Sequence, residues 1–296
     1  MFPTLSISTK TMIQVRNLSY TYPGSKEPVL KDISFDIQQG EIFGFLGPSG
    51  AGKSTTQKVL NGLLKGYQGS VEVNGTHLNQ MDRSFYEKIG VAFEFPNLYL
   101  KLTALENLQL FASFFKSETR DPDELLALVG LSDDRDTRVS AFSKGMKMRL
   151  NFIRSLLNRP EILFLDEPTA GLDPGNARIM KDIILGLQQD GVTIFLTTHH
   201  MDDAGELCER LAFMVKGSLP VIDSTSALKL RHGEKKVRVQ YSKEGSSLTE
   251  EFPMVGLGQN KAFQEIIQTR EVLTLHTLEA SLEEIFIQVT GQSLKQ

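Results

Sequence analysis

The segment from Gly47 to Ser54 has the residue types and the spacing of a phosphate-binding loop. Its sequence, GPSGAGKS, fits the pattern G-x-x-x-x-G-K-[ST]. Glycines let the backbone curl so that successive N–H groups point at phosphate oxygens, and the positive end of a following helix, expected to begin near Ser54, adds to the attraction. The pattern predicts that Lys53 contacts the β- and γ-phosphates of a nucleotide and that the Ser54 hydroxyl binds Mg²⁺. A chance glycine-rich turn is the alternative, and the apolar run EIFGFL directly before the loop argues against it.

Two adjacent acids, Asp166 and Glu167, follow a second apolar run, EILFL. A carboxylate at the end of a strand commonly does no more than cap the next helix. Beside a phosphate-binding loop, however, adjacent acids suit two tasks. We expect Asp166 to hold Mg²⁺ and Glu167 to act as a general base toward the attacking water.

A pair of histidines ends a third apolar run, GVTIFLTTHH. A lone histidine at such a place is more often an ordinary loop residue with a satisfied hydrogen bond. In a parallel sheet, however, it lies at the carboxyl edge where ligands bind. We therefore expect His199 to contact the γ-phosphate and assign no role to His200.

The elements that must position these residues alternate between strands and helices. Buried strands are predicted at 41–46, 161–166 and 191–198, and a helix at about 178–189, which implies a mostly parallel sheet with helices on both faces. From about 98 to 158 the pattern is helical, which suggests a helical subdomain inserted into the α/β core. Residues 211–223 read as a strand pair around Lys216 and Gly217.

The two ends of the chain differ from this core. Residues 1–11 carry no clear pattern and are expected to form an N-terminal extension of a domain spanning 12–223. Residues 224–296 combine an alternating strand pattern with two amphipathic helices and are expected to form a small α+β appendage. This appendage has two possible roles, a passive stabilising one, which we favour, and a regulatory or ligand-sensing one.

The bulk composition is that of an ordinary globular protein. Hydrophobic residues make up 40% and charged residues 23%, and the net charge of −4 gives no electrostatic reason to expect nucleic-acid binding. The single cysteine, Cys208, is expected to be a packing residue. No apolar run reaches the ~18 residues needed to span a bilayer, and Met1–Lys10 lacks the apolar core of a signal peptide. We expect a cytoplasmic chain whose membrane component, if any, is another polypeptide.

Further motifs make the chain resemble the nucleotide-binding subunit of an ABC transporter over about residues 12–222. They are FSKGM at 142–146, placed like the family's signature, AGLD at 170–173, placed like its D-loop, and TTHH, placed like its switch histidine. The resemblance implies a P-loop NTPase core of the ABC type that binds and hydrolyses ATP with Mg²⁺. The nucleotide-binding residues it implies are Tyr22 (the adenine-stacking aromatic), Gly47, Pro48, Ser49, Gly50, Ala51, Gly52, Lys53, Ser54, Thr55, Glu94, Ser143, Gly145 and Asp173.

Longer segments resemble the ATPases of drug- and antibiotic-export systems, such as the bacterial fluoroquinolone-export ATPases. These segments are IFGFLGPSGAGKSTTQKVL, IGVAFEFPNLYLKLTALENL and LEEIFIQVTG. The resemblance implies an export subunit, whereas an importer ATPase and a soluble ABC ATPase acting on ribosomes or DNA are the alternatives. The EFPN segment and the tail argue against an importer. The presence of one cassette without a heptad run argues against a soluble ATPase.

Three departures from the family pattern matter: one at the Q-loop and two in the signature. Glu94 stands where the family usually has the Q-loop glutamine; as a hard oxygen ligand it can still bind Mg²⁺, while adding negative charge. In the signature, Phe142, Lys144 and Met146 replace the usual leucine, glycine and glutamine. Ser143 and Gly145 remain, and these two supply the hydroxyl and the backbone N–H expected near phosphate.

The resemblance also implies partners. In this family the signature of a second subunit closes the P-loop site, so the chain is expected to work as a dimer, with itself or with a homologous subunit. A separate transmembrane permease would hold it at the inner face of the cell membrane. Apolar residues around 93–100 suggest a groove for a permease helix, although each of them could instead be a core residue.

Overall fold

The computed structural model describes residues 10–233, 236–243, 245–278 and 280–292. Contacts divide the chain into two compact units, with the boundary between Asp223 and Ser224. Unit 1 contains the loop and both acids singled out above. Unit 2 contains the C-terminal residues 224–293.

A six-stranded sheet forms the centre of unit 1. Its order is β10-β9-β3-β8-β7-β6, and the pairs β9–β3, β3–β8, β8–β7 and β7–β6 are parallel. Parallel pairing places the carboxyl ends of these strands at one edge, which is where loops can combine into a site. The strands are β3 (Ile42–Leu46), β6 (Ile89–Ala92), β7 (Ile162–Asp166), β8 (Thr193–Thr198), β9 (Arg210–Val215) and β10 (Ser218–Ser224).

A second, antiparallel sheet of order β2-β1-β4-β5 packs against the first. Phe35 of this sheet stacks on Phe43 with the ring centroids 5.8 Å apart and meets Phe195 at 6.4 Å, so an aromatic core lies between the two sheets. The alternating burial of its strands follows from that one-sided packing. These strands are β1 (Thr11–Tyr20), β2 (Leu30–Gln38), β4 (Gln68–Val73) and β5 (Thr76–His77).

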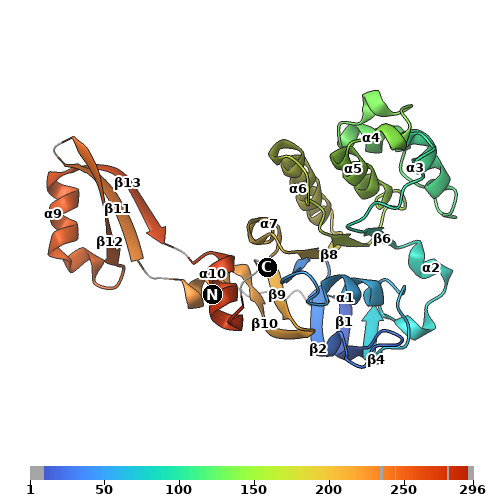
Figure 1. Ribbon diagram of the computed structural model, residues 1–296, viewed down its shortest axis with the longest axis horizontal. Helices are drawn as coiled ribbons and strands as arrows, with labels where there is room; N and C mark the ends of the chain where they lie inside the picture. Colours follow the sequence, from blue (N-terminus) through green and yellow to red (C-terminus); the bar gives the residue numbers. More distant parts are fainter. Residues whose placement is uncertain (1–9, 234–235, 244, 279, 293–296) are drawn as a thin grey trace, which may run out of the picture. The chain divides into compact units, whose positions relative to one another are not determined.

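Between β6 and β7 the chain forms a helical insert, in agreement with the prediction for 98–158. The three longer helices of the insert lie together, apart from the sheets (Figure 1). Asp121 caps one of them and is followed by Pro122, a usual first residue of a helix. The helices of unit 1 are α1 (Lys53–Leu60), α2 (Arg83–Tyr86), α3 (Ala104–Ala112), α4 (Pro122–Leu128), α5 (Lys144–Arg154), α6 (Pro174–Gln189) and α7 (Met201–Leu207).

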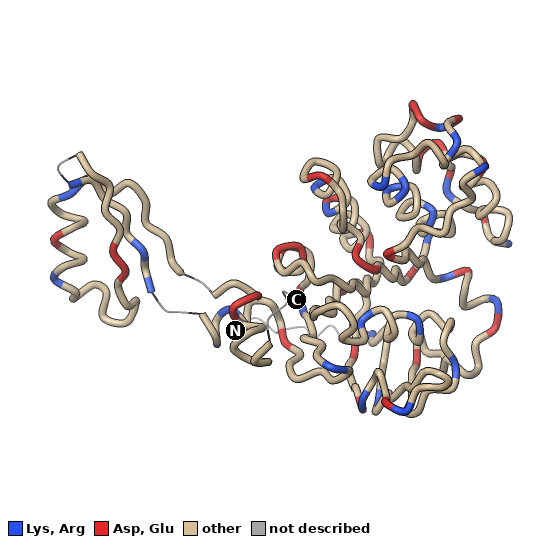
Figure 2. The backbone as a smooth tube through the Cα atoms, in the orientation of Figure 1, with Lys and Arg blue, Asp and Glu red and all other residues tan. Residues whose placement is uncertain are grey.

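Charges of both signs are spread over most of unit 1, whereas α5 carries only basic ones (Figure 2). Four of its residues are basic and none is acidic. The basic residues are Lys144, Lys147, Arg149 and Arg154.

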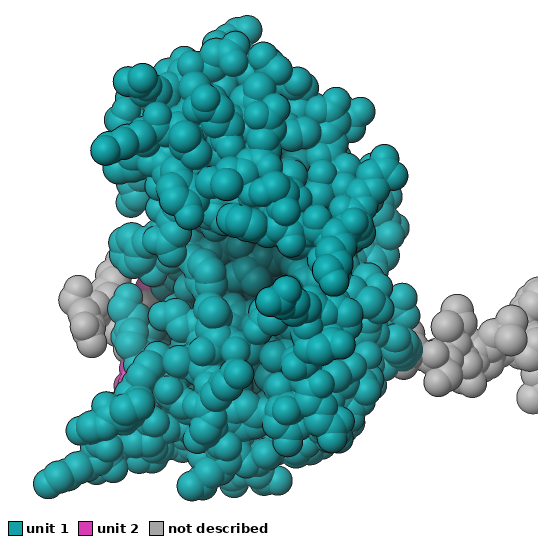
Figure 3. All heavy atoms as spheres, turned by 90° about the vertical axis from the view of Figure 1, so that its right-hand side faces the viewer, with its two compact units in different colours: residues 1–223, 294–296 teal, residues 224–293 magenta. Residues whose placement is uncertain are grey.

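A cavity of about 250 Å³ lies where the insert meets β6. Figure 3 shows the side of unit 1 on which α2 and α3 lie, with a hollow between its upper and lower parts. Aromatic and aliphatic side chains make up most of the lining, and Arg154 contributes the only charged group among the described residues that line it. The lining includes Leu63, Tyr86, Phe93, Phe111, Phe115 and Arg154.

Unit 2 is an antiparallel three-stranded sheet, β12-β11-β13, with α9 on one face. Its small core includes Val239, Tyr241, Phe252 and Phe263. Helices α8 and α10 pack against each other. The elements are α8 (Thr225–His232), β11 (Lys236–Lys243), β12 (Ser246–Pro253), α9 (Lys261–Thr269), β13 (Glu271–Leu278) and α10 (Leu282–Thr290).

The predicted α/β class with a mostly parallel sheet is confirmed. The first strand begins at Thr11, so this residue belongs to the β1–β2 pairing and not to an extension as predicted. Residues 1–9 of that predicted extension lie outside the described residues. Among the described residues no helix is both long and apolar enough to cross a bilayer.

Gly90 offers a test of how tightly the insert is joined to the sheet. A Cβ atom at this position would lie 2.1 Å from the backbone oxygen of Ser155, at the end of α5. Gly90→Ala should therefore lower the free energy of unfolding by about 1–3 kcal/mol, measured by urea denaturation. Gly186→Ala is the matched control, because that helical glycine has open space around it, and alanine there should stabilise by up to about 1 kcal/mol. Equal stability of the Gly90→Ala variant and the wild type would contradict this close packing.

Candidate functional site

The loop between β3 and α1 is held in place by contacts that require glycine. A Cβ atom at Gly47 would lie 2.1 Å from the carbonyl oxygen of Met214 in β9. Gly50 and Gly52 have φ angles of 76° and 116°, in the region that residues with a side chain rarely adopt. The glycine spacing thus allows the loop to curl tightly against a neighbouring strand.

The curled loop presents backbone donors that the described part of the chain does not use. The N–H groups of Gly50, Gly52, Lys53 and Ser54 donate to no acceptor in the described residues. They lie at the amino end of α1, where a helix carries a partial positive charge. The loop is therefore suited to bind phosphate oxygens.

Lys53 places its ammonium at the centre of the site. Its Nζ donates to the carbonyl oxygens of Gly47 at 2.7 Å and Pro48 at 3.2 Å and lies 3.9 Å from Oε1 of Glu167. Burial lowers the pKa of Lys53, and the negative charges of Glu167, Asp166 and Glu94 oppose that shift. The acids predicted from the sequence are thus the groups that offset the cost of burying this charge.

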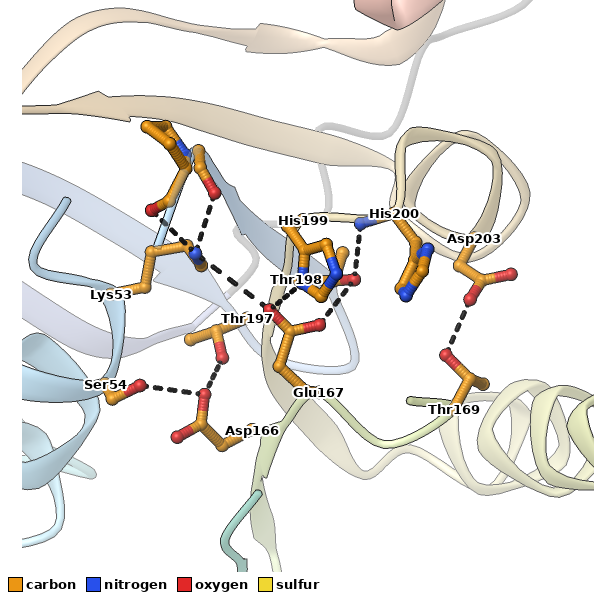
Figure 4. A network of polar contacts seen from close by, with 12 residues as sticks. Lys53, Ser54, Asp166, Glu167, Thr169, Thr197, Thr198, His199, His200 and Asp203 are labelled. Carbon is orange, nitrogen blue, oxygen red and sulfur yellow. Dashed lines mark hydrogen bonds and ion pairs between the residues drawn. The ribbon is translucent and has the colours of Figure 1, made fainter. Parts of the chain in front are cut away.

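Asp166 ends strand β7 and faces the first turn of α1. Its Oδ1 accepts a hydrogen bond from the Ser54 hydroxyl at 3.1 Å and another from the Thr197 hydroxyl of β8. The structure therefore brings two of the three predicted magnesium ligands, Ser54 and Asp166, into direct contact (Figure 4). Thr197 is a site residue to which the sequence analysis gave no role.

Glu167 is buried and held by two residues of the third apolar run. Its carboxylate accepts from the Thr198 hydroxyl at 3.1 Å and lies 2.8 Å from Nδ1 of His199 (Figure 4). Its φ angle of 51° is uncommon for a residue with a side chain, and such strain is often found at functional sites. Strands β7 and β8 are parallel neighbours that end side by side. The two threonines before His199 in the sequence therefore indicated which residues would lie beside Glu167.

Tyr22, Thr55 and Glu94 surround this centre. The Tyr22 hydroxyl is 3.2 Å from the Thr55 hydroxyl of α1, and the ring packs edge-on against Tyr20. Glu94 follows β6, is exposed, and lies close enough to raise the pKa of Lys53 by its charge. All three predicted positions therefore lie near the loop. Pro48, Ser49 and Ala51, also predicted, are part of the loop itself.

Ser143, Gly145 and Asp173 lie elsewhere in the unit. Ser143 caps α5, and its hydroxyl accepts from the N–H of Met146 at 3.2 Å; Asp173 caps α6. A Cβ atom at Gly145 would meet Leu172 at 3.5 Å, so the start of α5 adjoins the segment before α6. In the described part of the chain no hydrogen bond or ion pair joins these three residues to the loop.

Comparison with known proteins identifies two regions. The family described as "ABC transporter" matches residues 30–170, and the family described as "Fluoroquinolone efflux ABC transporter C-terminal domain" matches residues 235–279. The chain is 51% identical over 284 residues to the fluoroquinolones export ATP-binding protein of Mycobacterium tuberculosis strain H37Rv, covering 96% of this chain and 94% of that protein. It is 29% identical to the linearmycin resistance ATP-binding protein of Bacillus subtilis, over 96% of this chain and all of that protein.

Solved structures agree with this assignment. One similar structure is a dimeric ATP-binding cassette in a post-hydrolysis state bound to ADP and phosphate. It has a TM-score of 0.66 and 27% identity, and the match covers 72% of this chain and 99% of that one. The fold, the phosphate-binding loop with its two acids, and these relatives lead to one conclusion: this chain belongs to the ATP-binding proteins of ABC transporters and is an ATPase.

Proposed function

We propose that this chain powers the export of a drug or antibiotic through a separate membrane permease. The contact of Glu167 with both Lys53 and His199 is the observation that carries the ATPase part of the proposal. The direction of transport rests on the names of the relatives, which are export and resistance ATP-binding proteins. An importer ATPase and a soluble ABC ATPase are less consistent with those relatives.

The residues around Asp166 suit Mg²⁺. The carboxylate of Asp166 and the hydroxyl of Ser54 are hard oxygen donors 3.1 Å apart, which is the ligand type that Mg²⁺ prefers. Glu94 supplies a third oxygen donor from the loop after β6. When bound, Mg²⁺ would neutralise charge on the phosphates of ATP.

The protein groups divide the remaining work of hydrolysis. The free N–H groups of the loop and Lys53 bind the phosphates, and Tyr22 stacks on the adenine. Glu167 accepts a proton from the attacking water, and Thr198 and His199 hold its carboxylate in place. His199 also contacts the γ-phosphate. Catalysis then consists of positioning and charge stabilisation.

The site is completed by a second subunit. Among the described residues, no hydrogen bond or ion pair joins Ser143, Gly145 or Asp173 to the loop of their own chain, so they are available to the nucleotide of a partner. The amino end of the basic helix α5, capped by Ser143, is suited to the γ-phosphate. ATP would join two copies of this chain, or this chain and a homologous subunit, and hydrolysis would release them.

The cavity between β6 and the insert is the proposed contact for the permease. The segment after β6 has five candidates for either the core or a groove, of which Phe93 lines the cavity. None of the five is buried: Phe93, Phe95, Leu98, Tyr99 and Leu100. Phe95 is 74% exposed and Tyr99 and Leu100 are each 51% exposed, so this segment presents several large apolar side chains to solvent. An apolar helix of the permease would cover this surface.

Arg154 indicates which kind of side chain the permease helix should carry. Its guanidinium lies 4.5 Å from the ring centre of Phe111 and donates to Asn97 and Asn151, and it forms no ion pair with a described residue. Burial lowers its pKa to about 10. A carboxylate on the permease helix would offset this desolvated charge.

Binding to the permease would hold the chain at the inner face of the cell membrane. Residues 224–296 would have either a stabilising or a regulatory role.

Replacing Glu167 tests the proposed general base and the dimer together. Glu167→Gln should bind ATP with unchanged affinity, hydrolyse it about 100-fold or more slowly, and elute as a dimer with ATP. Phosphate release and size-exclusion chromatography measure these properties. Glu161→Gln is the control, because this exposed acid directly precedes β7 and its variant should retain full activity. A monomeric Glu167→Gln variant under all nucleotide conditions would contradict the shared site.

Replacing Glu94 tests its place beside the phosphates. Glu94→Gln should leave ATP affinity intact, because the loop and Lys53 provide most phosphate contacts, while changing the number of substrate molecules transported per ATP hydrolysed. Fluorescent-nucleotide binding and transport into inside-out vesicles measure the two quantities. Loss of all nucleotide binding would show that Glu94 has a different role.

Replacing Leu63 tests the permease groove. Leu63 lines the cavity and is 58% exposed, so Leu63→Glu should fold normally but place a charge where an apolar helix docks. Co-purification with the permease subunit should fall about tenfold or more, because the added carboxylate would either be desolvated on docking or pair with Arg154 in place of the permease's carboxylate. Leu230→Glu is the control, because Leu230 is 73% exposed in unit 2. Undiminished co-purification of Leu63→Glu would exclude this surface.

A further inference from the structure

A second set of metal-binding side chains lies beside the proposed Mg²⁺ ligands. The carboxylate of Glu167 and the imidazoles of His199 and His200 each bring a ligand atom within 4.8 Å of the others. His199 Nδ1 is 2.8 Å from Glu167 Oε1, and the two imidazole rings have centroids 4.2 Å apart (Figure 4). The proposed hydrolysis does not use His200.

Hydrogen bonds hold two of these residues in position. The Glu167 N–H donates to the carbonyl oxygen of Thr197 at 2.9 Å, and its carboxylate accepts from the Thr198 hydroxyl. The same Thr198 hydroxyl accepts from the N–H of His200 at 2.9 Å. Second-layer bonds of this kind orient metal ligands and raise metal affinity. Thr198 therefore connects the carboxylate to the backbone that carries the second histidine.

The donor set and the local charge favour a particular class of metal ion. Two imidazoles and one carboxylate are typical ligands of Zn²⁺ and similar transition-metal ions, whereas Mg²⁺ prefers oxygen donors alone. The ammonium of Lys53 lies 3.9 Å from Glu167, but the carboxylates of Asp166 and Glu167 together outweigh its charge. A divalent cation is thus electrostatically acceptable at this place.

We propose that Glu167, His199 and His200 bind a divalent transition-metal ion such as Zn²⁺, and that the bound ion inhibits ATP hydrolysis. Metal binding would occupy the carboxylate that has to accept a proton from water. It would also hold His199 away from the γ-phosphate. The inhibition rests on the proposed roles of Glu167 and His199, whereas the binding of the ion does not.

Binding is tested on the full chain without nucleotide, by competition for Zn²⁺ with a chromogenic chelator. His200→Ala should weaken Zn²⁺ binding about tenfold or more. Removing a residue that only hydrogen-bonds to a metal ligand already costs about tenfold, and His200 is proposed as a ligand itself. His77→Ala is the matched control, because this exposed histidine also lies near a carboxylate, 3.8 Å from Glu72, and it should leave the affinity unchanged. Equal Zn²⁺ affinity of wild type and His200→Ala would overturn the proposed site.

Inhibition is tested by ATPase assays with excess Mg²⁺ and increasing Zn²⁺. The wild type and His77→Ala should lose activity, while His200→Ala should keep its basal rate and require about tenfold more Zn²⁺ for half inhibition. The same half-inhibiting concentration in all three proteins would overturn the inhibitory role. If the wild type hydrolysed no ATP, the proposed function would fail, and the chelator competition would still decide the metal site.

Discussion

The buried ammonium of Lys53 is the charge around which the site is organised. Moving a cation from water into a protein costs several kcal/mol unless opposite charges and hydrogen bonds compensate. Here the carbonyl oxygens of Gly47 and Pro48 accept from it, and Glu167 lies 3.9 Å away. These groups come from two different segments of the chain. The arrangement is possible only because strands β3, β8 and β7 are parallel neighbours that end at one edge.

The same edge explains why hydroxyl groups surround the acids. Thr197 and Thr198 end β8 beside Asp166 and Glu167, and each donates to one of the two carboxylates. A buried carboxylate needs such donors, because an unsatisfied one would be costly. The donors also set the direction in which each acid points. Asp166 faces Ser54, and Glu167 faces His199, so two adjacent residues serve two different parts of the site.

Unit 1 presents two surfaces that its own residues leave incomplete. The N–H groups of the loop have no acceptor among the described residues, and the cavity beside β6 leaves apolar side chains exposed around Arg154. The first surface is suited to phosphate, and the second is the one proposed for an apolar helix of the permease. Helix α5 of the insert ends at the cavity with Arg154 and begins at Ser143, the residue proposed to contact the nucleotide of a second subunit. A rotation of this insert would therefore move both ends of α5 together.

The sequence by itself determined the ABC-type ATPase family and the class of fold. The spacing from Gly47 to Ser54, the adjacent acids and the buried apolar runs are local patterns, and local patterns are readable without the fold. It did not reveal the contact between Gly47 and Met214, the bonds from Thr197 and Thr198, or the approach of His200 to Glu167. These depend on strand order, which brings together segments far apart in the chain. Only the tertiary structure decided them, because hydrogen-bond partners and desolvation are properties of neighbours in space.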